Sequence, residues 1–395
     1  MTPGARVQAA IELLDAIVAA ARDQGPAADT LIARYFAARR YAGSKDRRAV
    51  RELVYAAIRR AGERPASGRA ALVGLADDDP ALAACFTGEG HAPAPIDAGE
   101  PRAAAGVAPA WLVEGLRGSQ LDDSELAALS GRAPLDVRVN RLKAGRGEVL
   151  ATIPGAEPLP HAPDGLRLPA GTAVEQLDAF RSGLLEVQDE GSQIVTLAAE
   201  ARPGMAVVDL CAGAGGKSLA LAAAMGNRGE LLACDIDRGR LSRLPARAER
   251  AGASIVVTRL MNPGREAEAL ADWRERADVV LVDAPCSGTG TWRRNPEARW
   301  RLTPERIERV AETQRRLLAI AAELVRPGGA LVHIVCSLLD EEGAGQIETF
   351  LAAHPGWTAA PLRLPAGQAR GQGVRLTPAH DGTDGFFVAR LLRPC

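Results

Sequence analysis

Two cysteines each follow a strongly apolar run in the second half of the chain. Cys286 ends the sequence Asp-Ala-Pro-Cys after the run 278–282, and Cys336 follows the run 330–335. Both runs have the length and β-branched content of buried parallel strands, whose carboxyl ends meet at the ligand-binding edge of a sheet. The two thiols are therefore predicted to face one ligand. A thiolate is a nucleophile, so the pair suggests covalent chemistry on a base.

A glycine-rich segment at 207–218 has the pattern of a strand, a tight turn and the start of a helix. Glycines let the main chain approach a ligand, and a helix N-terminus favours negative or hydrogen-bond-accepting groups. The spacing does not fit a phosphate loop, which needs glycine at position 211, or a dinucleotide fingerprint, because Ser218 replaces the third glycine. The candidate cofactor-binding residues of this turn are Cys211, Ala212, Gly213, Ala214, Gly215, Gly216 and Lys217.

Two charged residues near this turn, Asp235 and Lys217, occupy positions at which a charged side chain suits ligand binding. Asp235 ends the next predicted strand, where a carboxylate can bind both ribose hydroxyls of an adenosine. A helix N-cap is the structural alternative for this aspartate. Lys217 stands in the first turn of a predicted helix, where a cation meets the unfavourable end of the helix dipole. Its position favours a ligand or a partner carboxylate over a purely structural role.

The elements that must position these residues alternate as strand and helix from about residue 204 onward. This alternation predicts an α/β fold with a parallel, doubly wound sheet. The expected strands are 206–210, 230–234, 255–258, 279–283 and 330–335, with a last one at 386–389. A helix is expected over 304–325, with Thr303 as its N-cap.

The rest of the chain predicts two further domains. Helical spacing dominates residues 1–95, and proline-rich sequence follows this helical domain. Short strand-like pieces at 135–139 and 165–168 alternate with Gly and Pro turns, which indicates a small α+β module over 105–185. Residues 186–395 would then form the catalytic domain.

Composition limits the classes of protein. The chain has 395 residues, 47% hydrophobic and 25% charged, and its six cysteines are scattered without a C-x-x-C pair. That scatter indicates neither a zinc ribbon nor a disulfide framework, so we expect free thiols and no metal. No apolar run of about twenty residues and no signal-peptide pattern are found, so we expect a cytoplasmic protein without a membrane partner.

The formal net charge of -1 hides two arginine-rich regions. One region lies in the helical domain and the other directly follows Cys286. Such clusters favour a polyanionic partner such as RNA, although a solvated helix face is the alternative. Their members are Arg39, Arg40, Lys45, Arg47, Arg48, Arg51, Arg59 and Arg60 in the first, and Arg293, Arg294, Arg299, Arg301, Arg306 and Arg309 in the second.

Four segments in order resemble the motif series of RNA cytosine-C5 methyltransferases: 209–217, 283–290, 335–337 and 383–391. Residues 188–192 and 138–143 also resemble that family. Residues 43–48 and 52–55 resemble the NusB-like helical domain of its Sun/Fmu (RsmB-type) branch. The resemblance therefore covers nearly the whole chain. It implies a Rossmann-like methyltransferase sheet preceded by an all-α NusB-like, RNA-binding domain and the small module.

The resemblance also implies a reaction. An enzyme of this kind transfers a methyl group from S-adenosyl-L-methionine to carbon 5 of a cytidine. Cys336 would add to carbon 6 of the base, and Cys286 would help release the product. Swapped roles are the alternative, because DNA cytosine methyltransferases use the proline-cysteine thiol as the nucleophile. Asp283 would bind the base edge or the cofactor, and Lys217 would lie near the base.

The chain departs from the family pattern in three places. Ala214 replaces a proline in the turn, and Val335 replaces a threonine before the nucleophile. The aspartate expected near the adenine is missing after the strand 255–258, where Asn262 is the best polar substitute.

The expected substrate is a single-stranded or flipped-out cytidine, since carbon 6 is inaccessible inside a helix. We expect ribosomal RNA, from the small subunit, and no DNA partner. Residues 291–297, with Trp292, would form a lip for the nucleotide, unless they form a loop that Trp292 packs. The helical domain would give further RNA contact, with protein contact to a ribosomal partner as the alternative. Other functions that remain open are a tRNA cytosine-C5 methyltransferase, a non-catalytic RNA-binding assembly factor and, disfavoured by the broken fingerprint, a nicotinamide dehydrogenase.

Overall fold

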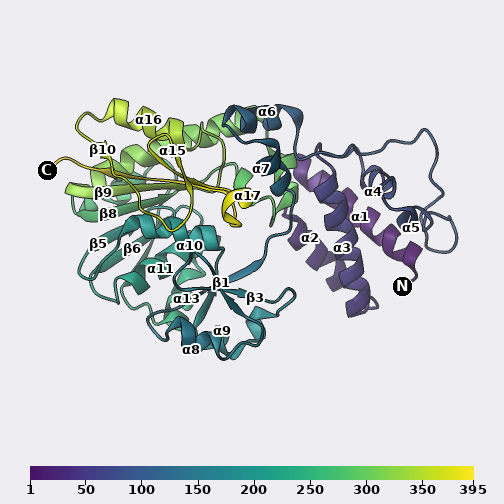
Figure 1. The fold of residues 1–395 in the computed structure, drawn as a ribbon, viewed down its shortest axis with the longest axis horizontal. Helices are drawn as coiled ribbons and strands as arrows, with labels where there is room; N and C mark the ends of the chain where they lie inside the picture. The colour runs from purple at the N-terminus through teal and green to yellow at the C-terminus, as the bar shows by residue number, and fades with distance from the viewer. The chain divides into compact units, whose positions relative to one another are not determined.

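Five parallel strands form one side of a nine-stranded sheet, up to its β7 edge, in the computed structural model, which describes residues 1–395 (Figure 1). The strand order is β11-β12-β13-β9-β8-β5-β6-β7, and β10 pairs with β13. The parallel members are β5 (Ala206–Asp209), β6 (Glu230–Asp235), β7 (Val256–Leu260), β8 (Ala277–Asp283) and β9 (Val325–Val335). After β5, the chain adds β6 and β7 on one side of β5. It then crosses over and adds β8 and β9 on the opposite side of β5. This reversal creates the crevice in which α/β sheets bind ligands.

The remaining strands make the sheet mixed rather than wholly parallel. They are β10 (Thr358–Ala359), β11 (Gln368–Arg370), β12 (Gly373–Leu376) and β13 (Phe386–Leu392). The strand β13, expected at 386–389, runs antiparallel to β9, with Phe387 opposite Val335. The expected fold class is confirmed, and the antiparallel edge continues the sheet beyond the Cys336 strand.

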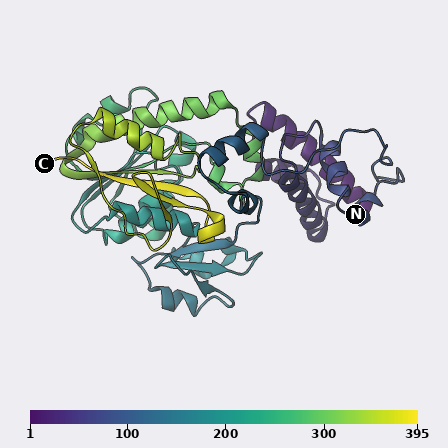
Figure 2. The same cartoon turned by 45° about the horizontal axis from the view of Figure 1, so that its top comes forward.

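Helices cover both faces of the sheet, as Figure 1 and Figure 2 show from two directions. Apolar side chains of α15 (Pro304–Leu324) and α16 (Ala344–Ala353) pack on one face, with Leu318 and Phe350 among them. The other face is covered by α10 (Glu190–Thr196), α11 (Gly216–Ala224) and α13 (Leu244–Ala251). Short helices complete the connections: α12 (Arg238–Leu241), α14 (Glu266–Ala269) and α17 (Pro378–Asp381). The sheet is therefore doubly wound.

A second, antiparallel sheet has the order β2-β3-β1-β4. Its strands are β1 (Leu135–Val139), β2 (Glu157–Pro158), β3 (Gly165–Leu168) and β4 (Leu185–Val187), with α8 (Arg146–Leu150) and α9 (Asp178–Arg181) beside them. Val137, Leu166 and Leu185 are fully buried in its own small core. The strands expected at 135–139 and 165–168 are confirmed.

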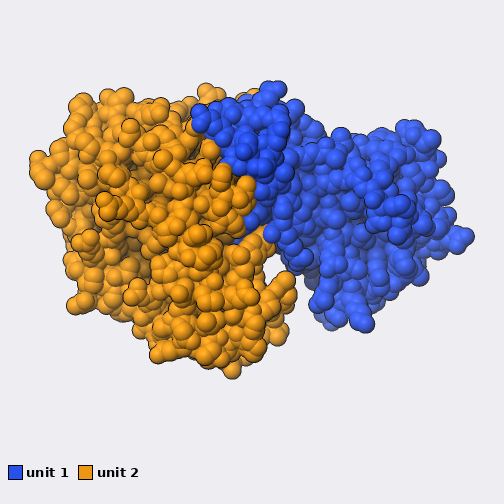
Figure 3. Space-filling model, in the orientation of Figure 1, with its two compact units in different colours: residues 1–132, 291–304 blue, residues 133–290, 305–395 orange.

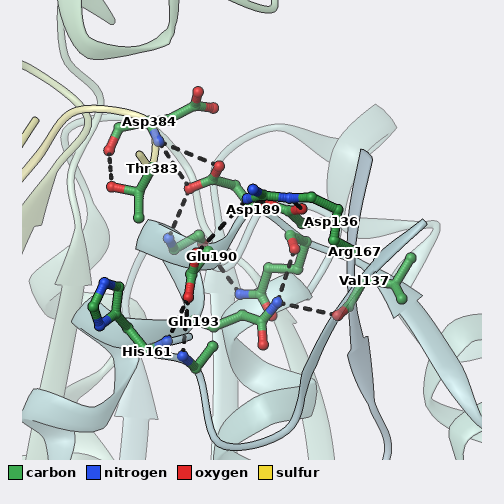
Figure 4. Close-up of polar contacts among 12 residues, drawn as sticks. Asp136, Val137, His161, Arg167, Asp189, Glu190, Gln193, Thr383 and Asp384 are labelled. Carbon is green, nitrogen blue, oxygen red and sulfur yellow. Dashed lines mark hydrogen bonds and ion pairs between the residues drawn. The ribbon is translucent and has the colours of Figure 1, made fainter. Parts of the chain in front are cut away.

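Hydrogen bonds at the start of α10 attach this small sheet to the large one (Figure 4). The carboxylate of Glu190 accepts from the His161 amide at 2.8 Å, and Gln193 Nε2 donates to the carbonyl of Val137 at 3.3 Å. On the other side, the carboxylate of Asp189 accepts from the amide of Asp384, just before β13. The module therefore belongs to the same compact unit as the large sheet, and this unit comprises residues 133–290 and 305–395 (Figure 3).

The other compact unit comprises residues 1–132 and 291–304. It is helical, as expected for residues 1–95, with α1 (Pro3–Arg22), α2 (Ala28–Ala38), α3 (Ser44–Arg60), α4 (Gly68–Ala76) and α5 (Pro80–Ala83). The helices α6 (Ala110–Gly118) and α7 (Asp123–Ala128), which the expected module of 105–185 included, also lie in this unit. None of the helices in the protein has the length and apolar character required to cross a membrane.

The segment 291–304 supplies part of the core of this helical unit. The guanidinium of Arg299 is fully buried and donates to the carbonyls of Ile58, Arg59 and Ala61 at the end of α3. Trp300 donates its indole N–H to Ala61 at 3.2 Å. Trp292 is 0% exposed. The expectation of a nucleotide lip is therefore wrong, because these side chains fill a protein core, and Arg299 is not available to RNA.

Candidate active site

The glycine-rich turn follows β5 and has the conformation that its sequence requires. Gly213 and Gly215 have φ values of +55° and +88°, a region that side chains with a Cβ rarely adopt. A Cβ on Gly215 would also lie 2.1 Å from Leu244 Cδ1. Arg247 supports the turn from α13 by donating to the carbonyl of Ala214 at 2.6 Å. The main chain is thus held open in front of the N-terminus of α11.

Asp235 lies at the end of β6 beside this turn. One carboxylate oxygen accepts from the Gly213 amide at 2.7 Å and the other from the Asp237 amide at 2.7 Å. The N-cap of α12 is Asp237, so the structural alternative considered for Asp235 does not hold. A carboxylate has about four lone-pair sites, so each oxygen of Asp235 keeps capacity for one more donor.

Asp209, at the end of β5, was not among the expected site residues. Its carboxylate is fully buried and accepts from Ser218 Oγ at 2.6 Å, while its other oxygen has no hydrogen-bond partner. Burial raises the pKa of Asp209 to about 7, and the nearby charge of Asp283 adds to the rise. Its position inside the first motif was the only signal in the sequence.

Lys217 forms an ion pair across the crevice between β5 and β8. Its Nζ lies 2.7 Å from Asp283 Oδ2, and the two side chains are 9% and 32% exposed. The ammonium also lies 5.6 Å from the centre of the Phe386 ring. Asp283 is therefore the partner carboxylate, one of the two explanations that the sequence suggested for Lys217. Asp283, the more accessible member, presents an acceptor at the sheet edge.

The two thiols meet beyond the ends of β8 and β9. These strands are paired in parallel with Asp283 opposite Ile334, which brings the following residues together. The Sγ atoms of Cys286 and Cys336 lie 3.3 Å apart, and both residues are partly exposed. The hydrogen bond with Cys336, followed by burial, raises the pKa of Cys286 well above its usual value, and the charge of Glu342 contributes. The contact with Cys336 therefore makes the Cys286 thiol less acidic than an isolated thiol.

The last predicted cofactor residue, Asn262, lies just beyond β7. It is exposed and follows Met261, whose amide donates to the carbonyl of Asp235 at 2.9 Å. The structure therefore places Asn262 at the same sheet edge as Asp235, and contact with an adenine remains a prediction. Cys211 and Ala212 directly follow β5, and Cys211 is partly exposed there.

Comparisons with known proteins agree with this geometry. A family model described as "16S rRNA methyltransferase RsmB/F" matches residues 196–392. The "Probable ribosomal RNA small subunit methyltransferase B" of Synechocystis sp. is 36% identical over 299 residues, 72% of this chain and 66% of that protein. The "Ribosomal RNA small subunit methyltransferase B" of Thermus thermophilus is 41% identical over 210 residues, 53% of this chain and 50% of that protein.

A solved structure named PH0851 covers 99% of both chains with a TM-score of 0.79 and 26% identity. The matched region spans about two thirds of the first curated relative and half of the second.

Proposed function

Because the chain belongs to the RsmB/F family of methyltransferases, we propose that it methylates carbon 5 of a cytidine in small-subunit ribosomal RNA, with S-adenosyl-L-methionine as methyl donor. The observation that carries the proposal is the contact between Cys286 and Cys336, with Sγ atoms 3.3 Å apart at the same sheet edge as the glycine-rich turn. The covalent mechanism requires one thiol to attack the base and a second group to release it.

The residues around β5 and β6 fit the cofactor. The open main chain at Gly213 and Gly215 can approach an adenosine, and the remaining acceptor sites of Asp235 match its two ribose hydroxyls. Asn262 is proposed to bind on the adenine side, in place of the missing aspartate. When bound, the cofactor supplies an activated methyl group.

Cys336 is the proposed nucleophile, because the resemblance to RNA cytosine-C5 methyltransferases gives this role to the cysteine after β9 and the release role to the proline-cysteine thiol, Cys286. The Cys336 thiolate adds to carbon 6 and gives carbon 5 the electron density to accept the methyl group. Once the Cys336 sulfur is bonded to carbon, the largest cause of the raised pKa of Cys286 is gone. Cys286 can then lose its proton to solvent and take the proton from carbon 5, and elimination frees Cys336. One proton is released in each cycle.

Asp283 and Lys217 are proposed to hold the base. The 4-amino group of cytosine is a donor that suits a carboxylate, and Asp283 is the accessible carboxylate of this edge. Lys217 fixes the direction of that carboxylate through the 2.7 Å contact.

The proposed partner is RNA with an unpaired or flipped-out cytidine, because a stacked base cannot present carbon 6 to a thiol. The exposed Arg47 and Arg48 on α3 are candidate phosphate contacts in the helical unit. The choice of small-subunit ribosomal RNA follows the names of the relatives, and tRNA is the competing substrate.

A trapping experiment tests the proposal. Small-subunit RNA carrying 5-fluorocytidine is incubated with the protein and S-adenosyl-L-methionine, and the crosslinked peptide is mapped. We expect an adduct on Cys336, none with Cys336→Ala, and an accumulating adduct on ordinary RNA with Cys286→Ala. An adduct on Cys286, or methylation by Cys336→Ala at the wild-type rate, would overturn the assigned roles. Methylation of tRNA alone would replace the substrate, and no binding of S-adenosyl-L-methionine would favour the non-catalytic assembly factor.

A further inference from the structure

A buried carboxylate connects the two loops that carry the thiols. We define the thiol loops as residues 285–290, after β8, and residues 336–339, after β9. Glu342 follows the second loop and is fully buried. Its Oε2 accepts from the Ser287 amide at 2.8 Å, and its Oε1 accepts from Ser337 Oγ at 2.8 Å. Ser287 and Ser337 each directly follow a site cysteine, so one side chain reaches both loops.

Further hydrogen bonds complete this connection. Ser287 Oγ donates to Ser337 Oγ at 3.1 Å, and the Leu338 amide donates to Thr289 Oγ1 at 2.8 Å. From α15, Gln314 Nε2 donates both to Glu342 Oε2 at 3.1 Å and to the carbonyl of Pro285 at 2.9 Å. The two loops are therefore attached to each other and to a helix of the core through groups adjacent to the sulfur atoms.

A carboxylate at position 342 does not increase the stability of the fold, because nothing nearby neutralises its charge. The groups that face the Glu342 carboxylate are Ser287, Ser337, Gln314 and the Cys286 thiol, and His333 Nε2 lies 3.0 Å from the main-chain carbonyl of Glu342. Burial lowers the pKa of His333 to about 4, so this ring is neutral near pH 7. No cation is among these groups. A buried carboxylate without a cation is costly, even when hydrogen bonds compensate part of the loss.

We infer that Glu342 is a positioning residue that holds Cys286 and Cys336 in contact and sets the reactivity of the pair. The inference rests on the proposed function for its effect on turnover, but its effect on the thiols is independent of RNA. Three donors converge on the two oxygens of Glu342. A glutamine has one acceptor oxygen in place of two: its oxygen can still accept from Ser287 and Gln314, but its NH2 must then donate to Ser337 Oγ, so the link to the second loop is reversed and no longer involves a charged acceptor. The Glu342→Gln substitution also removes a negative charge that faces Cys286.

The experiment compares Glu342→Gln with Glu341→Gln in the full chain, because Glu341 is the adjacent, exposed glutamate. In the first measurement, the protein is alkylated with iodoacetamide at a series of pH values in the absence of RNA. Peptide mapping gives the rate of alkylation of Cys286 at each pH. We expect the profile of Glu342→Gln to move to lower pH and that of Glu341→Gln to match the wild type. The second measurement is the steady-state kinetics of methylation. We expect kcat of Glu342→Gln to fall at least about ten-fold while its KM for RNA changes little, because misplaced reacting groups slow the chemical step and not RNA binding.

Two results would overturn the inference: an unchanged Cys286 profile in a folded Glu342→Gln protein, or an unchanged kcat. Should Glu342→Gln fail to fold, Ser337→Ala decides, because it removes one donor to Glu342 and should lower kcat with the same KM. Absence of methylation by the wild type would count against the proposed function, whereas the alkylation profile would still test Glu342.

Discussion

Lys217 Nζ contacts Asp283 Oδ2 at 2.7 Å and so joins the turn after β5 to the loop after β8. The contact places a cation and a carboxylate at the point where the strand order reverses, in the crevice that ligands occupy in such sheets. One ion pair thereby fixes the position of the glycine-rich turn, which is proposed to bind the cofactor, relative to the loop that carries Cys286.

Replacing Asp283 by Asn should lower kcat by about a hundred-fold, because the amide removes the carboxylate proposed to bind the 4-amino group. Lys217, 9% exposed, would lose its partner carboxylate, so the melting temperature should also fall. Steady-state methylation and thermal unfolding measure the two effects. Asp272→Asn, which removes a partner of an exposed ion pair with Arg259, is the control. A large loss of melting temperature with unchanged kcat would assign Asp283 a structural role instead.

Replacing Asp235 by Asn should weaken binding of S-adenosyl-L-methionine by about ten- to a hundred-fold, the value of hydrogen bonds to a charged acceptor. Calorimetric titration without RNA isolates this effect from catalysis. Glu230→Gln changes an exposed carboxylate at the opposite end of the same strand and should leave the affinity unchanged. Equal affinities of the Asp235 variant and the wild type would exclude the ribose contact.

Replacing Arg299 by Ala should reduce the free energy of unfolding by about 3 kcal/mol, because buried carbonyls at the end of α3 lose their donor. Burial lowers the pKa of Arg299 to about 10, so the lost group is a cation at neutral pH. Urea unfolding of the full chain gives the value. Arg48→Ala, on the exposed side of α3, should change it by less than about 0.5 kcal/mol. Equal losses for the two variants would contradict the role of Arg299 in the core.

Acid should destabilise the protein through His333. The folded pKa of about 4 lies below the usual 6.5, so the native state favours the neutral ring. The unfolded chain takes up a proton first as the pH falls. Stability is therefore lost between about pH 6.5 and pH 4, by up to about 3 kcal/mol. His333→Gln, which keeps a donor for the Glu342 carbonyl, should lack this loss. Urea unfolding at several pH values tests the difference, and parallel curves for both proteins would refute it.

The sequence was sufficient to predict the strands that carry the two cysteines, because β8 and β9 contain continuous apolar runs whose burial on both faces leaves a local signature. The meeting of Cys286 and Cys336 followed from the same reasoning, since parallel strands end at one edge. Trp292 was misplaced because an aromatic ring among arginines has the same local pattern in an RNA contact and in a core. Glu342 was missed because the pair Glu341-Glu342 resembles an exposed charged turn, and only the tertiary fold buries one member.

The segment 291–304 also sets an order of events during synthesis. A ribosome makes the N-terminal helices first, yet Arg299 and Trp300, which close the end of α3, are translated only after residues 133–290. Chains fold as they emerge, so the helical unit must wait with an open core while the strands up to β8 are produced. The part of the protein that is made first is therefore among the last to be finished, and ribosome-bound chains that stop before residue 291 should expose it to proteases.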